Sequence, residues 1–173
     1  MKLKIFCYSL IVLFCSCKSL NNIQNLNNSM DLLQIANQQQ IEIARVVGSI
    51  PTIEGPKEHF TGNVYVNHTI PGGHPSNFSG GIVTFSPGSR TVWHSHPKGQ
   101  RVIVIEGVGY IQQWGYSKIE IRSGDVIWIP PNVKHWHGAT VTNEMSHFAF
   151  AEIYEGSNVE NMEPVTEIQY TGM

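Results

Sequence analysis

Two histidines separated by one residue are the first chemical signal in this chain. His94 and His96 flank Ser95 in a run that begins at Thr91. In a β-strand, residues i and i+2 project to the same face, so both imidazoles are expected to point into one space. Such a pair can bind a divalent metal ion, but most isolated pairs of this kind are ordinary surface or core histidines. Further ligands at a defined spacing are therefore needed.

Two further residues could complete a metal site with this pair. Gln100 follows His96 by four residues, and His135 lies in a second block that contains Gly124 and Pro130. Three imidazole nitrogens and one amide oxygen suit a first-row divalent ion that keeps open positions for water or substrate. Because none of these ligands is charged, the ion keeps its full positive charge and polarises a carbonyl or hydroxyl strongly. This ligand set favours Lewis-acid chemistry. The alternative is a protein that has lost its metal and uses the cavity for binding only.

The elements that must position these ligands are short strands. From residue 43 onward, β-rich runs alternate with Gly, Pro and Asn at close spacing, and no long helical pattern competes. The predicted strands are 43–47, 63–67, 81–85, 101–105, 109–114, 118–121, 126–129 and 145–154. Many short strands with frequent turn signals indicate an all-β sandwich or barrel.

The two ligand blocks resemble the paired motifs of the cupin superfamily. Gly88 to Gly107 matches the pattern G-x5-H-x-H-x3–4-E-x6-G, with Gln100 in place of the usual Glu. Gly124 to His135 matches G-x5-P-x-G-x2-H, with Asn132 in place of Gly, and a turn with positive φ accepts Asn. The resemblance implies that His94, His96, Gln100 and His135 are the metal ligands. It also implies a single-domain cupin barrel, a double-stranded β-helix of the jelly-roll type, which we expect to span residues 43–156.

A closer resemblance is carried by the runs 91–100, 124–130 and 134–139, and by 60–64 and 165–170 outside them. These runs are similar to small bacterial cupins related to carboxymuconolactone decarboxylase-associated proteins, a group that includes the cupin-type hydroxynitrile lyases. The resemblance implies one bound manganese or iron ion and a barrel that is often oligomeric. The ligand types themselves leave nickel and zinc open. In the lyase members, it implies cleavage of a cyanohydrin, or its reverse.

The resemblance also implies catalytic positions. The lyases use a Thr just before the metal motif and a His on a late strand, and Thr91 and His147 match these positions. A Gln that the lyases carry four residues after this His is Ala151 here. Strand alternation puts Ala151 on the face of His147, and Glu152 on the opposite face.

His147 is, independently of the family, a candidate general base. An inward histidine near a dication has its protonated form disfavoured, so it can accept a proton at neutral pH. The alternative is an inward histidine that hydrogen-bonds to Thr91 or to a backbone carbonyl.

The surroundings of this centre can also be predicted. His137 shares a face with His135 and either orients the site from behind the ligands or is a partly buried, hydrogen-bonded histidine. Gly81 and Val83 are expected at the cavity mouth, where they leave room for a modest organic substrate. Histidines 59, 68 and 74 are expected to be solvated. Barrel packing is expected for Trp93, Trp128, Trp136 and Phe148.

The N-terminus is typical of a targeting segment. Lys2 and Lys4 precede an apolar run over 5–14, and the following Phe14-Cys15-Ser16-Cys17 resembles a bacterial lipobox with Cys17 as the lipidated residue. The predicted division is a signal peptide over 1–17, an Asn/Gln-rich tether over 18–42, the barrel, and a C-terminal extension over 157–173. This predicts a lipid-anchored protein of the bacterial cell envelope. The alternative is an uncleaved N-terminal anchor.

Composition and charge narrow the partners. A net charge of −2 and a pI near 6.4 provide no basic surface, which argues against nucleic acid and leaves a small-molecule substrate. Three functions agree with the sequence. One is a metal-dependent lyase on a small carbonyl or hydroxyl compound. The second is an Fe(II) dioxygenase, since a three-histidine site has open positions for O₂. The third is a non-catalytic envelope protein that binds a ligand or a metal.

Overall fold

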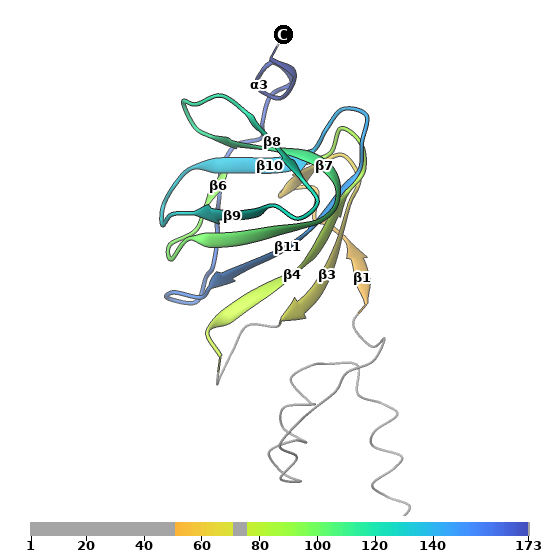
Figure 1. The fold of residues 1–173 in the computed structure, drawn as a ribbon. Coiled ribbons are helices and arrows are strands. Elements are labelled where there is room, and N and C mark those ends of the chain that lie inside the picture. Colours follow the sequence, from red (N-terminus) through yellow and green to blue (C-terminus); the bar gives the residue numbers. More distant parts are fainter. Residues whose placement is uncertain (1–50, 71–75, 173) are drawn as a thin grey trace, which may run out of the picture. The chain divides into compact units, whose positions relative to one another are not determined.

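The computed structural model describes residues 51–70 and 76–172 (Figure 1). All of them belong to one compact unit, Val46–Met173. The predicted signal peptide with Cys17, the tether, the strand over 43–47 and His74 lie outside the described residues. Within those residues, no helix has the length and apolar character needed to span a bilayer.

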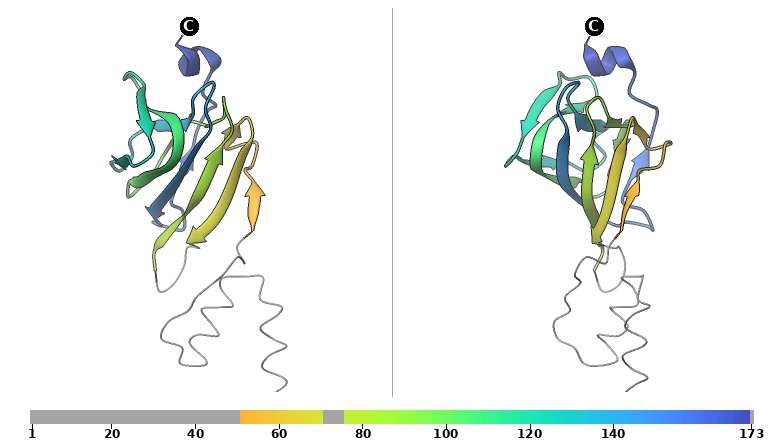
Figure 2. Two further views of the ribbon diagram at one scale, coloured as in Figure 1. Left: turned by 45° about the vertical axis from the view of Figure 1, so that its right-hand side comes forward. Right: turned by 90° about the vertical axis from the view of Figure 1, so that its right-hand side faces the viewer.

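Two antiparallel sheets form the body of the fold, and the long strand β7 (Gln100–Gln113) belongs to both (Figures 1 and 2). The first sheet has the order β1 (Thr52–Glu54), β3 (Val64–Ile70), β4 (Phe78–Phe85), β11 (Met145–Glu152), β7 and β9 (Val126–Ile129). The second has the order β2 (Phe60–Thr61), β5 (Arg90–Thr91), β10 (His135–Ala139), β7 and β8 (Ile119–Arg122). Two short strands, β6 (His94–Ser95) and β12 (Glu160–Asn161), pair with each other, and β6 also pairs with β10. The predicted all-β class is confirmed.

Strand β7 differs from the prediction. The Glu106-Gly107 pair was expected to separate two strands, but β7 runs through it. The pairing with β11 shifts register there, since Ser146 lies opposite Glu106 and His147 opposite Val104. The extra residue is a β-bulge, which bends the strand from one sheet into the other. Gly107 has a φ of 79°, a conformation that glycine adopts without steric strain.

The core lies between the two sheets. On β11, buried and half-buried residues alternate, which confirms the predicted face of His147 and Ala151. The aliphatic and aromatic side chains of the core include the fully buried Phe85, Val102 and Met145. This packing fixes the inward face of each strand, because a shift of one residue would turn every inward side chain outward.

The predicted aromatic packing is correct in part. Trp93 and Trp136 are buried and pack with Val165 and Tyr170. Trp128 is 48% exposed, so its predicted barrel packing is wrong. It lies on the short strand β9, where its ring faces outward. The guanidinium carbon of Arg101 lies 4.4 Å from the centroid of this ring.

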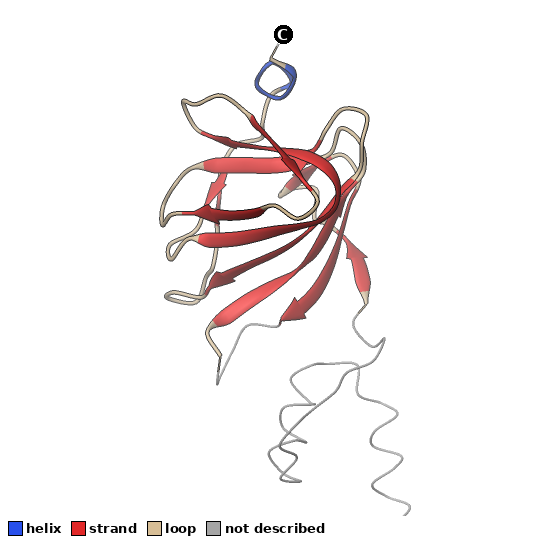
Figure 3. Cartoon of the chain, viewed as in Figure 1, coloured by secondary structure: helices blue, strands red, loops and turns tan. Residues whose placement is uncertain are grey.

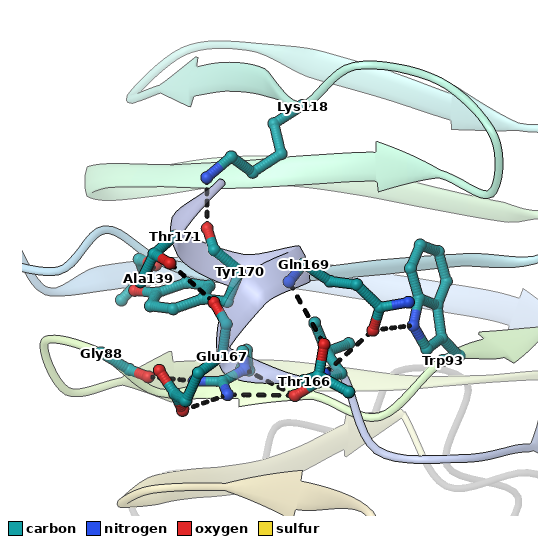
Figure 4. A network of polar contacts seen from close by, with 11 residues as sticks. Gly88, Trp93, Lys118, Ala139, Thr166, Glu167, Gln169, Tyr170 and Thr171 are labelled. Atoms are coloured by element: carbon teal, nitrogen blue, oxygen red, sulfur yellow. Dashed lines mark hydrogen bonds and ion pairs between the residues drawn. The ribbon is translucent and has the colours of Figure 1, made fainter. Parts of the chain in front are cut away.

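The C-terminal extension packs against the second sheet through the helix α3 (Glu167–Thr171) (Figure 3). The buried Arg90 donates hydrogen bonds to the Val165 carbonyl at 3.0 Å and to the Glu167 carboxylate at 2.6 Å. The Tyr170 hydroxyl donates to the Ala139 carbonyl at 2.9 Å (Figure 4). Trp93 Nε1 donates to Gln169 Oε1 at 3.2 Å. These contacts hold the segment after β12 against the barrel.

Candidate metal centre

The four predicted ligands lie close together in the fold. His94 on β6 is directly opposite His135 on β10, and their ring centroids are 4.2 Å apart. The His96 ring lies 5.1 Å from that of His94 and 5.6 Å from that of His135. Gln100 begins β7, and its Oε1 is 3.4 Å from His135 Nε2. The spacing in the sequence therefore predicted residues that the fold brings to one place.

The turn that precedes His135 has the backbone conformation that the motif predicts. Asn132 has a φ of 61°, so it adopts the positive φ expected at the position where the motif usually has Gly. Its backbone N–H donates to the His96 carbonyl at 2.9 Å. This bond ties the turn of the second motif to the first motif.

Each of the three histidines is oriented by a backbone carbonyl. The Nδ1 atoms lie 3.0 Å from the Val92 oxygen for His94, 2.6 Å from the Asn158 oxygen for His96, and 2.8 Å from the Val133 oxygen for His135. A carbonyl only accepts, so each Nδ1 carries the proton and each Nε2 keeps a free lone pair.

His96 Nε2 is buried and has no hydrogen-bond partner among the described residues. Buried polar atoms rarely lack a partner, and a metal-bound histidine typically donates its other nitrogen to a carbonyl in this way. The side chains therefore fit a divalent cation.

Burial keeps these imidazoles neutral. Desolvation, with a smaller contribution from His135, lowers the pKa of His94 well below its usual value. Desolvation also lowers the pKa of His96, and it brings the pKa of His135 to about 4. Neutral imidazole is the form that binds metal, so at neutral pH no proton competes with the cation.

A fourth histidine lies in the same cluster. One ring nitrogen each from His94, His135 and His137 lie within 4.8 Å of one another, so these three residues could also hold a metal ion. His137 is buried, and its Nε2 lacks a hydrogen-bond partner in the described part of the chain. Two overlapping ligand sets therefore share His94 and His135. The sequence did not point to His137 as a ligand, because the motif spacing selects His135.

His137 also contacts the predicted base. His147 Nε2 lies 3.1 Å from His137 Nδ1, so one ring donates to the other. His147 is fully buried, and burial lowers its pKa to about 4. Thr91 Oγ1 accepts a hydrogen bond from the His137 backbone N–H at 3.2 Å. The side-chain partner of His147 is thus His137, whereas the alternative prediction named Thr91 or a backbone carbonyl.

A cavity of about 180 Å³ opens onto this cluster. Thr91, His147 and Val83 line it as predicted. Gly81 and Ala151 are buried but are not among the lining residues, so the predicted place of Gly81 at the cavity mouth is wrong. Both lie farther along their strands, with Gly81 opposite Ala149 and Ala151 opposite Gln100, and Ala149 contacts the cavity in their place.

The sequence missed part of the cavity wall. His59 lines the cavity and is half-buried, whereas it was expected to be solvated. Asn158, Val159 and Asn161 of the C-terminal extension line it as well. They arrive there because β12 pairs with β6, which puts Asn161 opposite His94. No spacing rule links these residues to the ligand motifs.

Comparison with known proteins identifies the class. A family model described as "Cupin domain" matches residues 81–150. The (R)-mandelonitrile lyase of Granulicella tundricola is 45% identical over 130 residues, which cover 75% of this chain and 98% of the lyase. This chain belongs to the cupin superfamily.

Solved structures agree with this assignment. A cupin-like protein of Thermotoga maritima is 39% identical with a TM-score of 0.66, over 69% of this chain and 90% of that one. The polyketide cyclase RemF of Streptomyces resistomycificus is 21% identical with a TM-score of 0.56, over 76% of this chain and 94% of the cyclase. The second likeness concerns the fold alone.

Proposed function

We propose that this cupin is a metal-dependent lyase that acts on a small carbonyl or hydroxyl compound such as a cyanohydrin. The ligands of the divalent ion, manganese or iron in this proposal, are His94, His96, Gln100 and His135. The observation that carries the proposal is a cluster of buried imidazoles, with the Nε2 atoms of His96 and His137 unpartnered among the described residues, beside His147 in one cavity. The identity to a mandelonitrile lyase supports the reaction class.

In this proposal His147 moves the proton. Cleavage of a cyanohydrin removes the hydroxyl proton, forms the carbonyl and releases cyanide, and His147 accepts that proton. A pKa of about 4 makes His147 a weak base. A divalent cation, when bound, supplies Lewis-acid activation that lowers the pKa of the substrate hydroxyl, so that a weak base suffices.

The neighbours of His147 orient the reacting groups. His137 hydrogen-bonds to His147 and fixes its ring orientation. The Thr91 oxygen accepts from the His137 backbone, which leaves the Thr91 hydroxyl proton free to donate to the substrate. The cavity has room for a small substrate.

The test compares metal content and turnover. Wild type and His96→Ala are loaded with Mn(II) or Fe(II), assayed for bound metal, and offered a panel of cyanohydrins and hydroxy-carbonyl compounds. We expect His96→Ala to lose both metal and turnover. Unchanged turnover without bound metal would refute the proposal. Oxygen uptake by the anaerobically iron-loaded protein would assign dioxygenase chemistry to the same centre.

We also propose that the chain is lipid-anchored at the bacterial cell envelope through Cys17, on the strength of the lipobox-like sequence. Metabolic labelling with a clickable fatty acid in a bacterial host tests this. Wild type is expected to carry the label, and Cys17→Ser is expected to lose it. A Cys17→Ser variant that keeps the label would contradict the proposal.

A further inference from the structure

One part of the cavity wall is polar and has no role in the proposed function. The side chains of His59, Asn158 and Asn161 line the cavity. His59 and Asn158 are half-buried, and Asn161 is exposed. Among the described residues, these three side chains have no hydrogen-bond partner, although the backbone of His59 and of Asn158 is hydrogen-bonded. We name these three residues the polar rim.

Asn161 continues the row of proposed ligands toward solvent. His135 lies directly opposite His94 across β10 and β6, and His94 lies directly opposite Asn161 across β6 and β12. Directly opposite residues share one face of a sheet. The C-terminal extension runs beside β6 (Figure 1). Because His135 and His94 are buried and Asn161 is exposed, this row leads from the ligand cluster to the mouth of the cavity.

His59 borders the cavity from the same side. Phe60 on β2 is directly opposite Thr91, and the His59 carbonyl accepts a hydrogen bond from the Val92 backbone N–H at 3.0 Å. β10 pairs with one edge of β5 and β6, so β2 and β12 lie along the other edge. His59 and Asn161 therefore follow one another along one edge of the segment that holds the first metal motif.

The part of the cavity wall that the first sheet supplies is apolar. Val83, Phe85 and Ala149 on β4 and β11 line it. No Asp, Glu, Lys or Arg is found among the residues of the described chain that line the cavity. A bound molecule thus meets carbon on one side and uncharged hydrogen-bonding groups on the other.

A hydroxyl group matches the polar rim better than a charged group does. An Asn amide and a neutral imidazole each offer a donor and an acceptor, as a hydroxyl does. Carboxylates are typically bound by Arg or Lys, and ammonium groups by carboxylates, and the cavity wall has neither partner. Neighbouring strands lie about 4.8 Å apart, a distance that roughly two or three carbon–carbon bonds span.

We propose that the polar rim binds a second hydroxyl group of the substrate, carried by a carbon close to the reacting one. This inference rests on the proposed function and narrows its substrates to small aliphatic hydroxy-aldehydes and hydroxy-ketones and their cyanohydrins. Asn161 hydrogen-bonds the second hydroxyl, with His59 and Asn158 beside it. The carbon chain lies against Phe85 and Ala149. The polar rim binds and positions the substrate and takes no part in proton transfer.

Two ketones that differ in one group test the polar rim. Hydroxyacetone carries a hydroxyl where butanone carries a methyl group of nearly the same size. The full chain, loaded with Mn(II), is offered the cyanohydrins of both ketones. Wild type is expected to show a KM about tenfold lower for the cyanohydrin of hydroxyacetone, because only this substrate hydrogen-bonds to the rim.

Substitutions in the rim should act on KM alone. Asn161→Leu and His59→Leu should each raise the KM for the cyanohydrin of hydroxyacetone by about five- to tenfold. The KM for the cyanohydrin of butanone and both kcat values should stay within about twofold. Glu160→Leu is the matched control, because Glu160 is exposed, precedes Asn161 on β12 and does not line the cavity. A wild type without preference, or an Asn161→Leu variant that weakens both substrates equally, would overturn the proposal.

A binding measurement separates this inference from the proposed function. If neither cyanohydrin is cleaved, the lyase proposal fails, and ligand-observed NMR of the full chain with Zn(II), which is diamagnetic, still measures the Kd of each ketone. Wild type should bind hydroxyacetone about tenfold more tightly than butanone, and Asn161→Leu should remove this difference. Equal affinities in the wild type, or no binding of either ketone, would overturn the polar rim as a hydroxyl-binding site.

Discussion

At the residue scale, the identity of the metal ligands depends on which Nε2 atoms lie close enough to bind the same ion. His96→Ala removes a proposed ligand and should lower the affinity for Mn(II) by more than 100-fold. His137→Ala should lower it about 10- to 100-fold, the usual effect of losing a residue that orients the ligands. Calorimetric titration with Mn(II) measures both.

His59→Ala is the matched control for these variants, because His59 lines the cavity outside the ligand cluster. Its affinity for Mn(II) should equal that of the wild type. If His137→Ala lost the metal while His96→Ala kept it, the ligands would be His94, His135 and His137.

The buried histidines also make the metal-free protein sensitive to acid. Burial lowers the pKa of His135 and His147 to about 4 in the folded state. In the unfolded chain a histidine titrates near 6.5, so below that pH the unfolded state binds more protons and the free energy of unfolding falls. We expect a loss of up to roughly 1.4 kcal/mol per pH unit for each of these histidines between about pH 6 and pH 4.

Urea unfolding of EDTA-treated protein at pH 7, 6 and 5 measures this loss. His147→Gln removes one titrating group and should flatten the dependence on pH. A free energy of unfolding that stays constant or rises as the pH falls would contradict the burial of neutral imidazoles.

The sequence predicted that the four proposed ligands would lie together, but it did not predict their neighbours. His94, His96, Gln100 and His135 were predictable because motif spacing in strands and turns determines which side chains share a face. The contacts of His137 were not, because they depend on a β10 side chain that meets a β11 side chain, and the spacing does not encode that contact. His59 and Asn158 reach the cavity through strand pairings and a loop far from either motif.

At the scale of elements, the bend of β7 is the feature that the sequence pattern predicted least well. The sequence pattern predicts a break at Gly107, yet Gly107 continues a strand through a bulge. Glycine is common both in turns and in bulges, and only the partner strand decides between them. By contrast, β9 was predicted with its observed bounds, 126–129, because turn residues flank it on both sides.

Substitution at Gly107 should therefore destabilise the fold strongly. A Cβ at this position would overlap the Glu144 carbonyl oxygen, in addition to the strain of a φ of 79°. We expect Gly107→Ala to lower the free energy of unfolding by about 3 kcal/mol. Urea unfolding of the metal-free protein measures the change.

Gly115→Ala is the matched control. Gly115 has a φ of 82°, and a Cβ there would meet no atom within 4 Å, so only the backbone strain remains. Its loss should be about 1 kcal/mol. Equal losses at the two positions would show that crowding at the bend does not contribute.

At the scale of the whole molecule, the C-terminal extension is expected to link the stability of the barrel to the candidate metal centre. Arg90 donates hydrogen bonds to the Val165 carbonyl and the Glu167 carboxylate. Its guanidinium carbon also lies 4.3 Å from the centroid of the Tyr170 ring. The same extension supplies the Asn158 carbonyl that orients His96. Loss of the Arg90 contacts should therefore disturb the proposed ligand His96, which contacts the other end of the extension.

Arg90→Met tests this link. Removal of the buried guanidinium leaves the Val165 carbonyl without its donor, so the free energy of unfolding should fall by about 2–4 kcal/mol. The affinity for Mn(II) should fall about tenfold, because His96 loses part of its orientation. Glu167→Gln is the control: its side chain is 74% exposed, so the change should be below about 1 kcal/mol and the affinity should be unchanged. An Arg90→Met protein that is less stable but binds Mn(II) as the wild type does would mean that the extension closes the barrel without orienting His96.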